Sequence, residues 1–185
     1  MKKILFTAVA ATALASAPAF AADTDTVSFQ VNGTIQPECS IAQPTDVTFA
    51  QILINEGPGS NALLLKNGTP ASSTQNVWVS CNYAAKISAT SANGGLLNAG
   101  GAALAANDPD DFTNLINYRI QLTATDGHFP TLDFRTKLEA SDSVTAAGAF
   151  HNEAALRVYV DRDDTAKRPV AGTYTDTATL TVGPV

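Results

Sequence analysis

Charged and chemically reactive side chains are scarce in this sequence. Of its 185 residues 15% are charged, and it contains two cysteines and two histidines. The G-x-S-x-G, H-E-x-x-H and glycine-rich phosphate-binding motifs are all missing. The histidines, His128 and His151, are isolated and do not extend the cysteine pair to a zinc motif. We therefore expect no catalytic activity, no cofactor and no bound metal.

Positive charge and long apolar runs are also in short supply. The chain has 11 basic against 17 acidic residues, a formal net charge of −6. Such a surface repels phosphate backbones and anionic headgroups, so we expect no nucleic acid partner. No run after the first 21 residues approaches the 18 apolar residues of a membrane helix, and no direct membrane insertion is expected. Hydrophobic residues still make up 45% of the chain, enough for a folded core.

The first 21 residues have the three parts of an export signal. Lys2 and Lys3 precede the apolar stretch Ile4 to Ala15, and Ala19-Phe20-Ala21 is a small-x-small cleavage site. The stretch is too short for a membrane anchor, because twelve residues reach about 18 Å as a helix against a bilayer core of about 30 Å. We expect cleavage after Ala21 and export, through a periplasm to the cell surface or the medium.

Export decides how the two cysteines are interpreted. In an oxidising compartment, Cys39 and Cys81 are expected to form a disulfide. Two free thiols or a metal-binding pair are the alternatives.

Period-two alternation of apolar residues recurs along the chain, whereas helical periodicity is nearly absent. Near the N-terminus Val27, Phe29 and Val31 share one face, and Ile35 continues the series. Near the C-terminus one face holds Tyr174, Ala178, Leu180 and Val182. Alternation predicts strands over residues 26–35, 47–49, 76–81, 86–90, 115–123, 155–161 and 173–182. These short strands predict an all-β, antiparallel β-sandwich, with a β-barrel as the alternative.

Between the predicted strands lie turns and loops. Asp126-Gly127 is a hairpin signal, and residues 91–114, rich in Gly, Ala and Asn, are expected to be a mobile surface excursion. His128 and His151 are expected in loops. The acidic clusters 108–111 and 161–164 lack the calcium-loop pattern and are interpreted as solvated turns. A glycan-binding function would be favoured if several aromatic side chains lay exposed on one sheet face. The candidates are Trp78, Tyr83, Tyr118, Tyr159 and Tyr174.

Three segments resemble the spore coat protein U domain family, which includes subunits of archaic chaperone-usher pili. They are the N-terminal Thr26-Val-Ser-Phe-Gln-Val-Asn-Gly-Thr-Ile35 with Cys39-Ser-Ile after it, the strand Val-Trp-Val-Ser-Cys81, and Arg168-Pro-Val-Ala-Gly-Thr-Tyr-Thr-Asp-Thr-Ala-Thr-Leu-Thr-Val182. The last is similar to the family's closing Pro-Ala-Gly-Thr-Tyr-Ser-Asp-Thr strand.

The resemblance implies an immunoglobulin-like sandwich that lacks one strand, which a partner supplies. Residues 22–35 would be a donor-strand segment and residues 36–185 the sandwich domain. The alternative for the N-terminal segment is that it forms the first strand of its own domain. The donor side chains would be Val27, Phe29, Val31 and Ile35. The expected partners are other copies or related subunits, a periplasmic chaperone and an outer-membrane usher, with roles in cell adhesion and biofilms. The alternative function is a self-contained secreted module that binds a glycan or a protein.

Overall fold

The computed structural model describes residues 25–185, so the predicted signal, residues 1–21, lies outside the described residues. The chain divides into two units, residues 1–35 and 36–185. In the first unit the described residues 25–35 form no strand, although their alternation predicts one. Their four large apolar side chains are 81–87% exposed: Val27, Phe29, Val31 and Ile35. All of the described residues of this unit, 25–35, are exposed.

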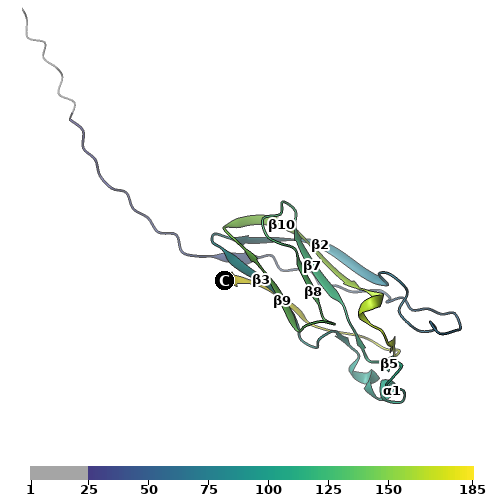
Figure 1. Cartoon of the computed structure of the whole chain (residues 1–185). Coiled ribbons are helices and arrows are strands. Elements are labelled where there is room, and N and C mark those ends of the chain that lie inside the picture. Colours follow the sequence, from purple (N-terminus) through teal and green to yellow (C-terminus); the bar gives the residue numbers. More distant parts are fainter. Residues whose placement is uncertain (1–24) are drawn as a thin grey trace, which may run out of the picture. The chain divides into compact units, whose positions relative to one another are not determined.

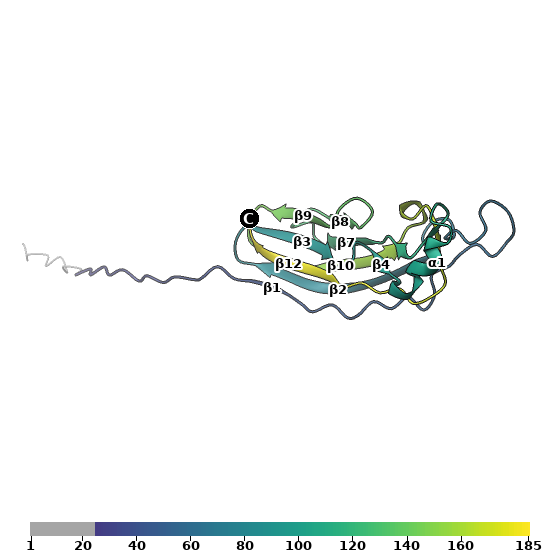
Figure 2. The ribbon, with the colours of Figure 1, turned by 90° about the horizontal axis from the view of Figure 1, so that it is seen from below.

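The second unit is built from two main antiparallel sheets (Figures 1 and 2). The five-stranded sheet has the order β1 (Cys39–Ile41), β2 (Ala71–Cys81), β10 (Phe150–Val160), β7 (Arg119–Ala124), β8 (Leu132–Arg135). The three-stranded sheet has the order β12 (Ala178–Pro184), β3 (Ala85–Ser91), β9 (Ser141–Ala146). The predicted all-β class with antiparallel sheets is confirmed.

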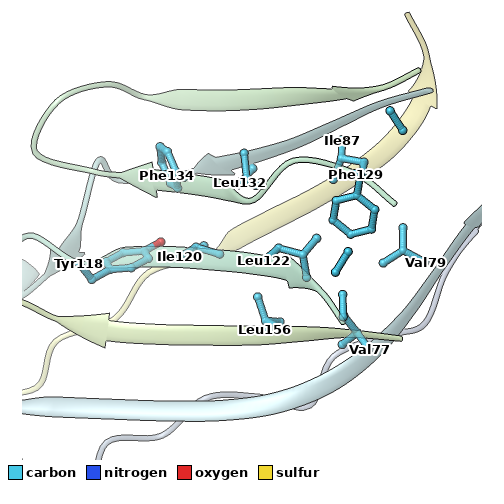
Figure 3. Close-up of a cluster of buried hydrophobic side chains, with 14 of the residues drawn as sticks. Val77, Val79, Ile87, Tyr118, Ile120, Leu122, Phe129, Leu132, Phe134 and Leu156 are labelled. Atoms are coloured by element: carbon cyan, nitrogen blue, oxygen red, sulfur yellow. The ribbon is translucent and has the colours of Figure 1, made fainter. Parts of the chain in front are cut away.

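The core lies between these two sheets, and strand alternation supplies it. In β2 the side chains of Val77, Val79 and Cys81 are buried, while Trp78 between them is 48% exposed. Figure 3 shows Leu122 and Leu132 of the larger sheet gathered with Ile87 of the smaller one. Burying each large apolar side chain contributes about 1.5–3 kcal/mol, so this layer is what holds the sheets together.

Residues 91–114 are not the mobile excursion that their composition suggests. They contain short elements and fold against the C-terminal part of the chain: β4 (Leu96–Leu97), η1 (Ala99–Gly101), α1 (Ala102–Ala106) and β5 (Phe112–Thr113). β4 pairs with β6 (Leu115–Ile116), and β5 pairs in parallel with β11 (Arg168–Pro169). The physical reason is Asn98, which is 6% exposed: its side-chain amide donates to the Ala171 carbonyl, and its backbone carbonyl accepts from the Asn114 side-chain amide.

Several predicted strands differ in extent from those observed. Residues 115–123 break into β6 and β7, and residues 47–49 form no strand. The C-terminal strand begins at Ala178 rather than at residue 173. The residues before it are held instead by hydrogen bonds to the Asn98 side chain and to the backbone of loop residues. β8 and β9 were not predicted; β9 has a single large apolar residue, Val144, and so carries little alternation.

Two predictions about polar residues are wrong. His151 lies in β10 rather than in a loop, and its ring stacks on Trp78 with centroids 4.7 Å apart. Asp164 is not part of a solvated turn, since it is 7% exposed within η2 (Arg162–Asp164). That short helix is capped by Asp161, whose carboxylate accepts a hydrogen bond from the Asp163 N–H at 3.0 Å.

Candidate strand-binding groove

A groove of about 1530 Å³ opens on the second unit between two chain segments. One wall is residues 41–52 and the other is residues 169–180. Its floor is made by core side chains of β6, β7, β10 and the residues between them: Ile116, Tyr118, Ile120, Leu156 and Val158. Figure 3 shows Ile120 and Leu156 on neighbouring strands of the larger sheet, β7 and β10, with Tyr118 just before β7. Ile116, Tyr118, Ile120 and Leu156 are only 1–4% exposed, so a group bound in the groove would lie directly over the core.

The C-terminal wall carries the residues that alternation placed on one face. Tyr174, Ala178 and Leu180 line the groove, and Val182 packs against the core farther along β12. β12 pairs with β3 on one side only and forms the edge of its sheet among the described strands. Backbone groups on the other side of an edge strand can pair with an added strand. The wall thus combines apolar side chains with a free strand edge.

The carboxylate of Asp176 fixes this wall from inside. Its Oδ2 accepts hydrogen bonds from the Tyr118 hydroxyl at 2.8 Å and from Ser91 Oγ, and its Oδ1 accepts from the N–H groups of Asn93 at 3.0 Å and Thr177 at 2.8 Å. Burial, with a further contribution from Asp176, raises the pKa of the Tyr118 hydroxyl well above its usual range. Tyr118 therefore stays a neutral donor at any physiological pH.

A second polar contact fixes the wall farther upstream. The side-chain amide of Asn98 donates to the Ala171 carbonyl at 3.2 Å, and the Tyr174 hydroxyl donates to the Val170 carbonyl at 2.7 Å. Gly172 between them has a φ of +147°, a conformation that L side chains rarely adopt. These contacts explain the Gly-Thr-Tyr sequence in the C-terminal motif.

The opposite wall is held more loosely to β2. The Ala42 N–H donates to the Trp78 carbonyl at 2.8 Å, and Gln75 exchanges hydrogen bonds with Thr45 through both ends of its amide. Phe49 on this wall is partly buried and packs against the core. Residues 42–52 form no strand, so this wall also lacks a regular ladder along the groove.

The predicted disulfide is confirmed. Cys39 and Cys81 are bonded, and they are the first pair in the register of β1 with β2. The bond joins the start of one strand to the end of another, as expected, and it overturns the free-thiol and metal-pair alternatives.

The remaining candidate residues do not assemble into a second site. Tyr118 and Tyr159 are buried, so the aromatics do not form an exposed row, and Trp78 is covered on one side by His151. Asp111 of the acidic cluster pairs with Arg168 at 2.5 Å. Within residues 25–185 no three Asp, Glu, His or Cys side chains are placed to hold a metal ion. In the same range no helix is long and apolar enough to cross a membrane.

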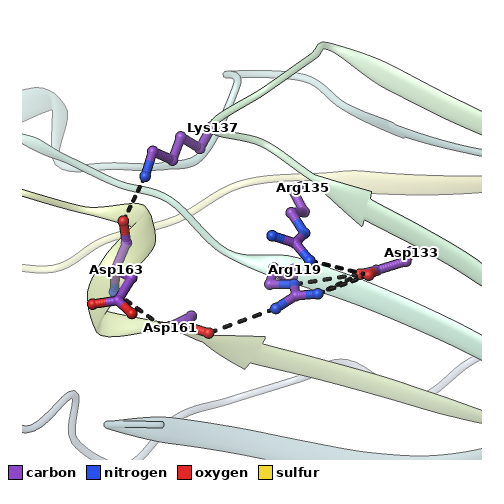
Figure 4. Close-up of polar contacts among 6 residues, drawn as sticks. All are labelled: Arg119, Asp133, Arg135, Lys137, Asp161 and Asp163. Atoms are coloured by element: carbon purple, nitrogen blue, oxygen red, sulfur yellow. Dashed lines mark hydrogen bonds and ion pairs between the residues drawn. The ribbon is translucent and has the colours of Figure 1, made fainter. Parts of the chain in front are cut away.

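Acidic residues near η2 serve in a network on the five-stranded sheet (Figure 4). Arg119 pairs with Asp133 at 2.7 Å and with Asp161 at 3.6 Å, and Lys137 donates to the Asp163 carbonyl at 2.5 Å. Burial alone would raise the pKa of Asp133, but the hydrogen bond and charge of Arg119, with help from Arg135, lower it. This network is structural and lies outside the groove lining.

Sequence reasoning missed the two polar residues that shape the groove, Asn98 and Asp176. Asp176 did carry a signal, since it falls in phase with Tyr174, Ala178 and Leu180 on an otherwise apolar face. A charged residue in such a phase indicates a buried hydrogen-bonded group. Asn98 lies in a Gly- and Ala-rich stretch and has no comparable signal.

The fold and the groove together define the class of this protein: an antiparallel β-sandwich domain with a groove beside one edge strand. The model of the Spore Coat Protein U domain matches residues 25–181, and the chain belongs to that family. Members are secreted structural subunits of surface fibres or coats, and the family is not one of enzymes. No curated protein and no solved structure shows significant similarity to the chain.

Proposed function

We propose that this protein is a fibre subunit that assembles by donor-strand complementation. The segment from Val27 to Ile35 of one copy fills the groove of the next copy and pairs with the free edge of β12. Assembly is head to tail, because the donor segment and the groove are different parts of each subunit, and such a contact generates an open fibre. Residues 22–35 are the donor segment and residues 36–185 the acceptor domain.

The groove is the observation that carries this proposal. It is open to solvent yet floored by core side chains such as Ile120 and Leu156, and its C-terminal wall is an edge strand. An added strand would satisfy both features at once: its side chains cover the floor and its backbone pairs with the edge.

The donor segment has the matching properties. Val27, Phe29, Val31 and Ile35 lie at two- or four-residue spacing, so all point to one face of an extended strand, and all four are exposed. Burying them would contribute about 5–10 kcal/mol before the cost of ordering the segment is subtracted. The nine residues from Val27 to Ile35 would span about 30 Å as a strand.

The same features call for assistance before assembly. A groove that lies over the core and a free strand edge are aggregation hazards in an isolated subunit. We therefore propose that a periplasmic chaperone occupies the groove first and that an outer-membrane usher exchanges it for the donor segment of the next subunit. The subunit passes through the periplasm after removal of residues 1–21 and ends at the cell surface.

The test is removal of the donor segment from the exported protein. A variant lacking residues 22–31 should fold with its chaperone and form no polymers, and a synthetic peptide of residues 25–35 should bind it and raise its melting temperature. The control peptide carries Val27→Ser, Phe29→Ser and Val31→Ser and should not bind. A second control peptide with Ser28→Ala and Gln30→Ala, on the opposite face, should bind like the parent. Polymers formed by the truncated variant would refute the proposal.

A further inference from the structure

Leu63 is the one non-glycine residue with a positive φ in residues 25–185, at +62°. A branched side chain is unfavourable there, where glycine or asparagine is preferred. Leu63 is also 43% exposed, so its side chain is not what keeps the backbone in this conformation. Backbone strain that persists beside an exposed apolar side chain is typical of a functional surface.

The loop around Leu63 is held in place by specific contacts. The Leu63 N–H donates to the Asn55 carbonyl at 2.8 Å. Arg168 donates from Nε to the Ala62 carbonyl at 2.9 Å and from Nη2 to the Ser60 carbonyl at 2.8 Å. The side chain of Leu63 is thus presented to solvent on a fixed loop.

Two further apolar residues line the same groove beside Leu63. Leu104 on α1 is 59% exposed, and Phe112 of β5 is half-buried. We call Leu63, Leu104 and Phe112 the leucine patch. Figure 2 shows α1 at the end of the domain opposite to the C-terminus and β1. The leucine patch therefore lies at the end of the groove that is remote from the disulfide.

The direction of an added strand follows from the sheets. Every strand pair in the two main sheets is antiparallel. A donor strand that pairs with β12 in the same way would have its C-terminal end beside the start of β12, on the side of α1. Ile35 of the donor would then leave the groove next to the leucine patch.

The link between donor segment and domain is short. Only three residues separate Ile35 from Cys39, so their Cα atoms can be at most about 14 Å apart. The disulfide end of the donor's own domain must therefore lie close to the leucine patch of the acceptor. That end carries a hollow of about 530 Å³, with the Cys39–Cys81 bond, Ala149 and Phe150 in its lining and Glu38, Asn82 and His151 among its polar residues.

We propose that the leucine patch of one subunit packs against this hollow at the disulfide end of the next subunit. The contact is a second, heterologous interface between copies, added to the donor strand, and it rests on the proposed function. It covers the exposed Leu63 and Leu104 side chains only in the assembled fibre. Its effect is to fix the angle between successive domains and to slow dissociation.

The test uses polymers of the full chain that carry Leu63→Asn and Leu104→Gln. Asparagine tolerates a positive φ and glutamine is a good helix former, so the isolated subunit should keep its stability. Because Leu63 and Leu104 also line the groove, binding of the peptide of residues 25–35 is measured in parallel, and polymers should dissociate in denaturant at least about tenfold faster than the parent beyond any change in the dissociation rate of the peptide. Leu138→Gln is the matched control, because Leu138 is 68% exposed and lies outside the groove lining.

Unchanged dissociation of the double variant, with peptide binding intact, would overturn this inference and leave the donor-strand proposal standing. Failure of the peptide to bind the parent domain would instead contradict the proposed function. A cross-linking experiment tests the geometry directly. Polymers with Leu104→Cys and Ala149→Cys should give a ladder of disulfide-linked multimers on a non-reducing gel, while Leu138→Cys with Ala149→Cys should not. Absence of the ladder in polymers that have formed would also overturn the inference.

Discussion

The side-chain amide of Asn98 occupies the space that any side chain at Gly172 would need. A Cβ added at Gly172 would lie 2.2 Å from Asn98 Nδ2, far inside van der Waals contact. Asn98 is buried, its side-chain amide donates to the Ala171 carbonyl, and its backbone carbonyl accepts from the Asn114 side-chain amide, so it is not free to move away. One wall of the groove is therefore set by a glycine and an asparagine that are 74 residues apart.

We predict that Gly172→Ala destabilises the domain by about 2 kcal/mol or more, because a clash is added to an unfavourable φ. Urea denaturation of the purified domain measures the change. Gly148→Ala is the control, since nothing lies within 4 Å of an added Cβ there and its φ is not positive. Equal effects at the two positions would contradict this account of the wall.

Loss of the disulfide should lower stability without altering the register of β1 against β2. We predict that Cys39→Ser with Cys81→Ser reduces the free energy of unfolding by about 2–5 kcal/mol, the usual effect of removing a native disulfide. The denaturation midpoint with and without reductant measures it: reductant should shift the parent toward the variant and leave the variant unchanged. If the denaturation midpoint of the variant equalled that of the oxidised parent, the disulfide would contribute nothing to stability.

The pairing of Asp133 with Arg119 should appear in acid unfolding. The folded-state pKa of Asp133 lies below its ordinary value of 3.8, so its contribution is present above about pH 4 and is lost as pH falls through the folded pKa. We predict that Arg119→Gln is destabilising at neutral pH and that this loss of stability shrinks as pH falls below 3.8. Lys137→Gln is the control, because Lys137 bonds a backbone carbonyl and not a carboxylate. A loss of stability in Arg119→Gln that did not depend on pH would contradict the pairing of Asp133 with Arg119.

Tyr118 should make the domain sensitive to alkali. Its folded-state pKa is raised above 10.0, so its contribution is present below pH 10 and is lost as pH rises further. We predict that Tyr118→Phe lowers stability by about 1 kcal/mol at neutral pH, because Asp176 loses one of its donors. The difference from the parent should narrow above pH 10, as followed by urea midpoints. If the urea midpoints of the two proteins changed in parallel with pH, the result would count against the Tyr118–Asp176 hydrogen bond.

Alternation predicted the strands that bury one face and expose the other. In the predicted strand 76–81 Val77 and Val79 are buried and Trp78 between them is exposed, and in the predicted strand 115–123 Ile120 and Leu122 lie in the core. It failed where strands are short or polar on both faces, as in β9, and where a buried side chain lies in a loop, as with Phe129. Such positions depend on partners distant in sequence, which a local pattern does not contain.

The groove was less predictable than the sheets. The apolar phase of Val27, Phe29 and Val31 indicates a donor segment from sequence alone, and it remains a prediction. The acceptor side depends on Asn98 and Asp176, whose contacts join residues 91–98 to 171–177. A single sequence shows that these residues are polar but not that they meet.

The position of the disulfide has a mechanical consequence. In a fibre, tension carried by the donor segment would enter each domain through residues 36–38 and arrive at Cys39. β1 has only three residues and could be peeled from β2 if hydrogen bonds alone held it. The bond to Cys81 passes the load directly into β2, whose 11 residues all pair with β10 in the middle of the sheet. Pulling force is thereby borne along the length of the longest strands rather than at a fraying edge, and a reduced subunit should yield at a lower force.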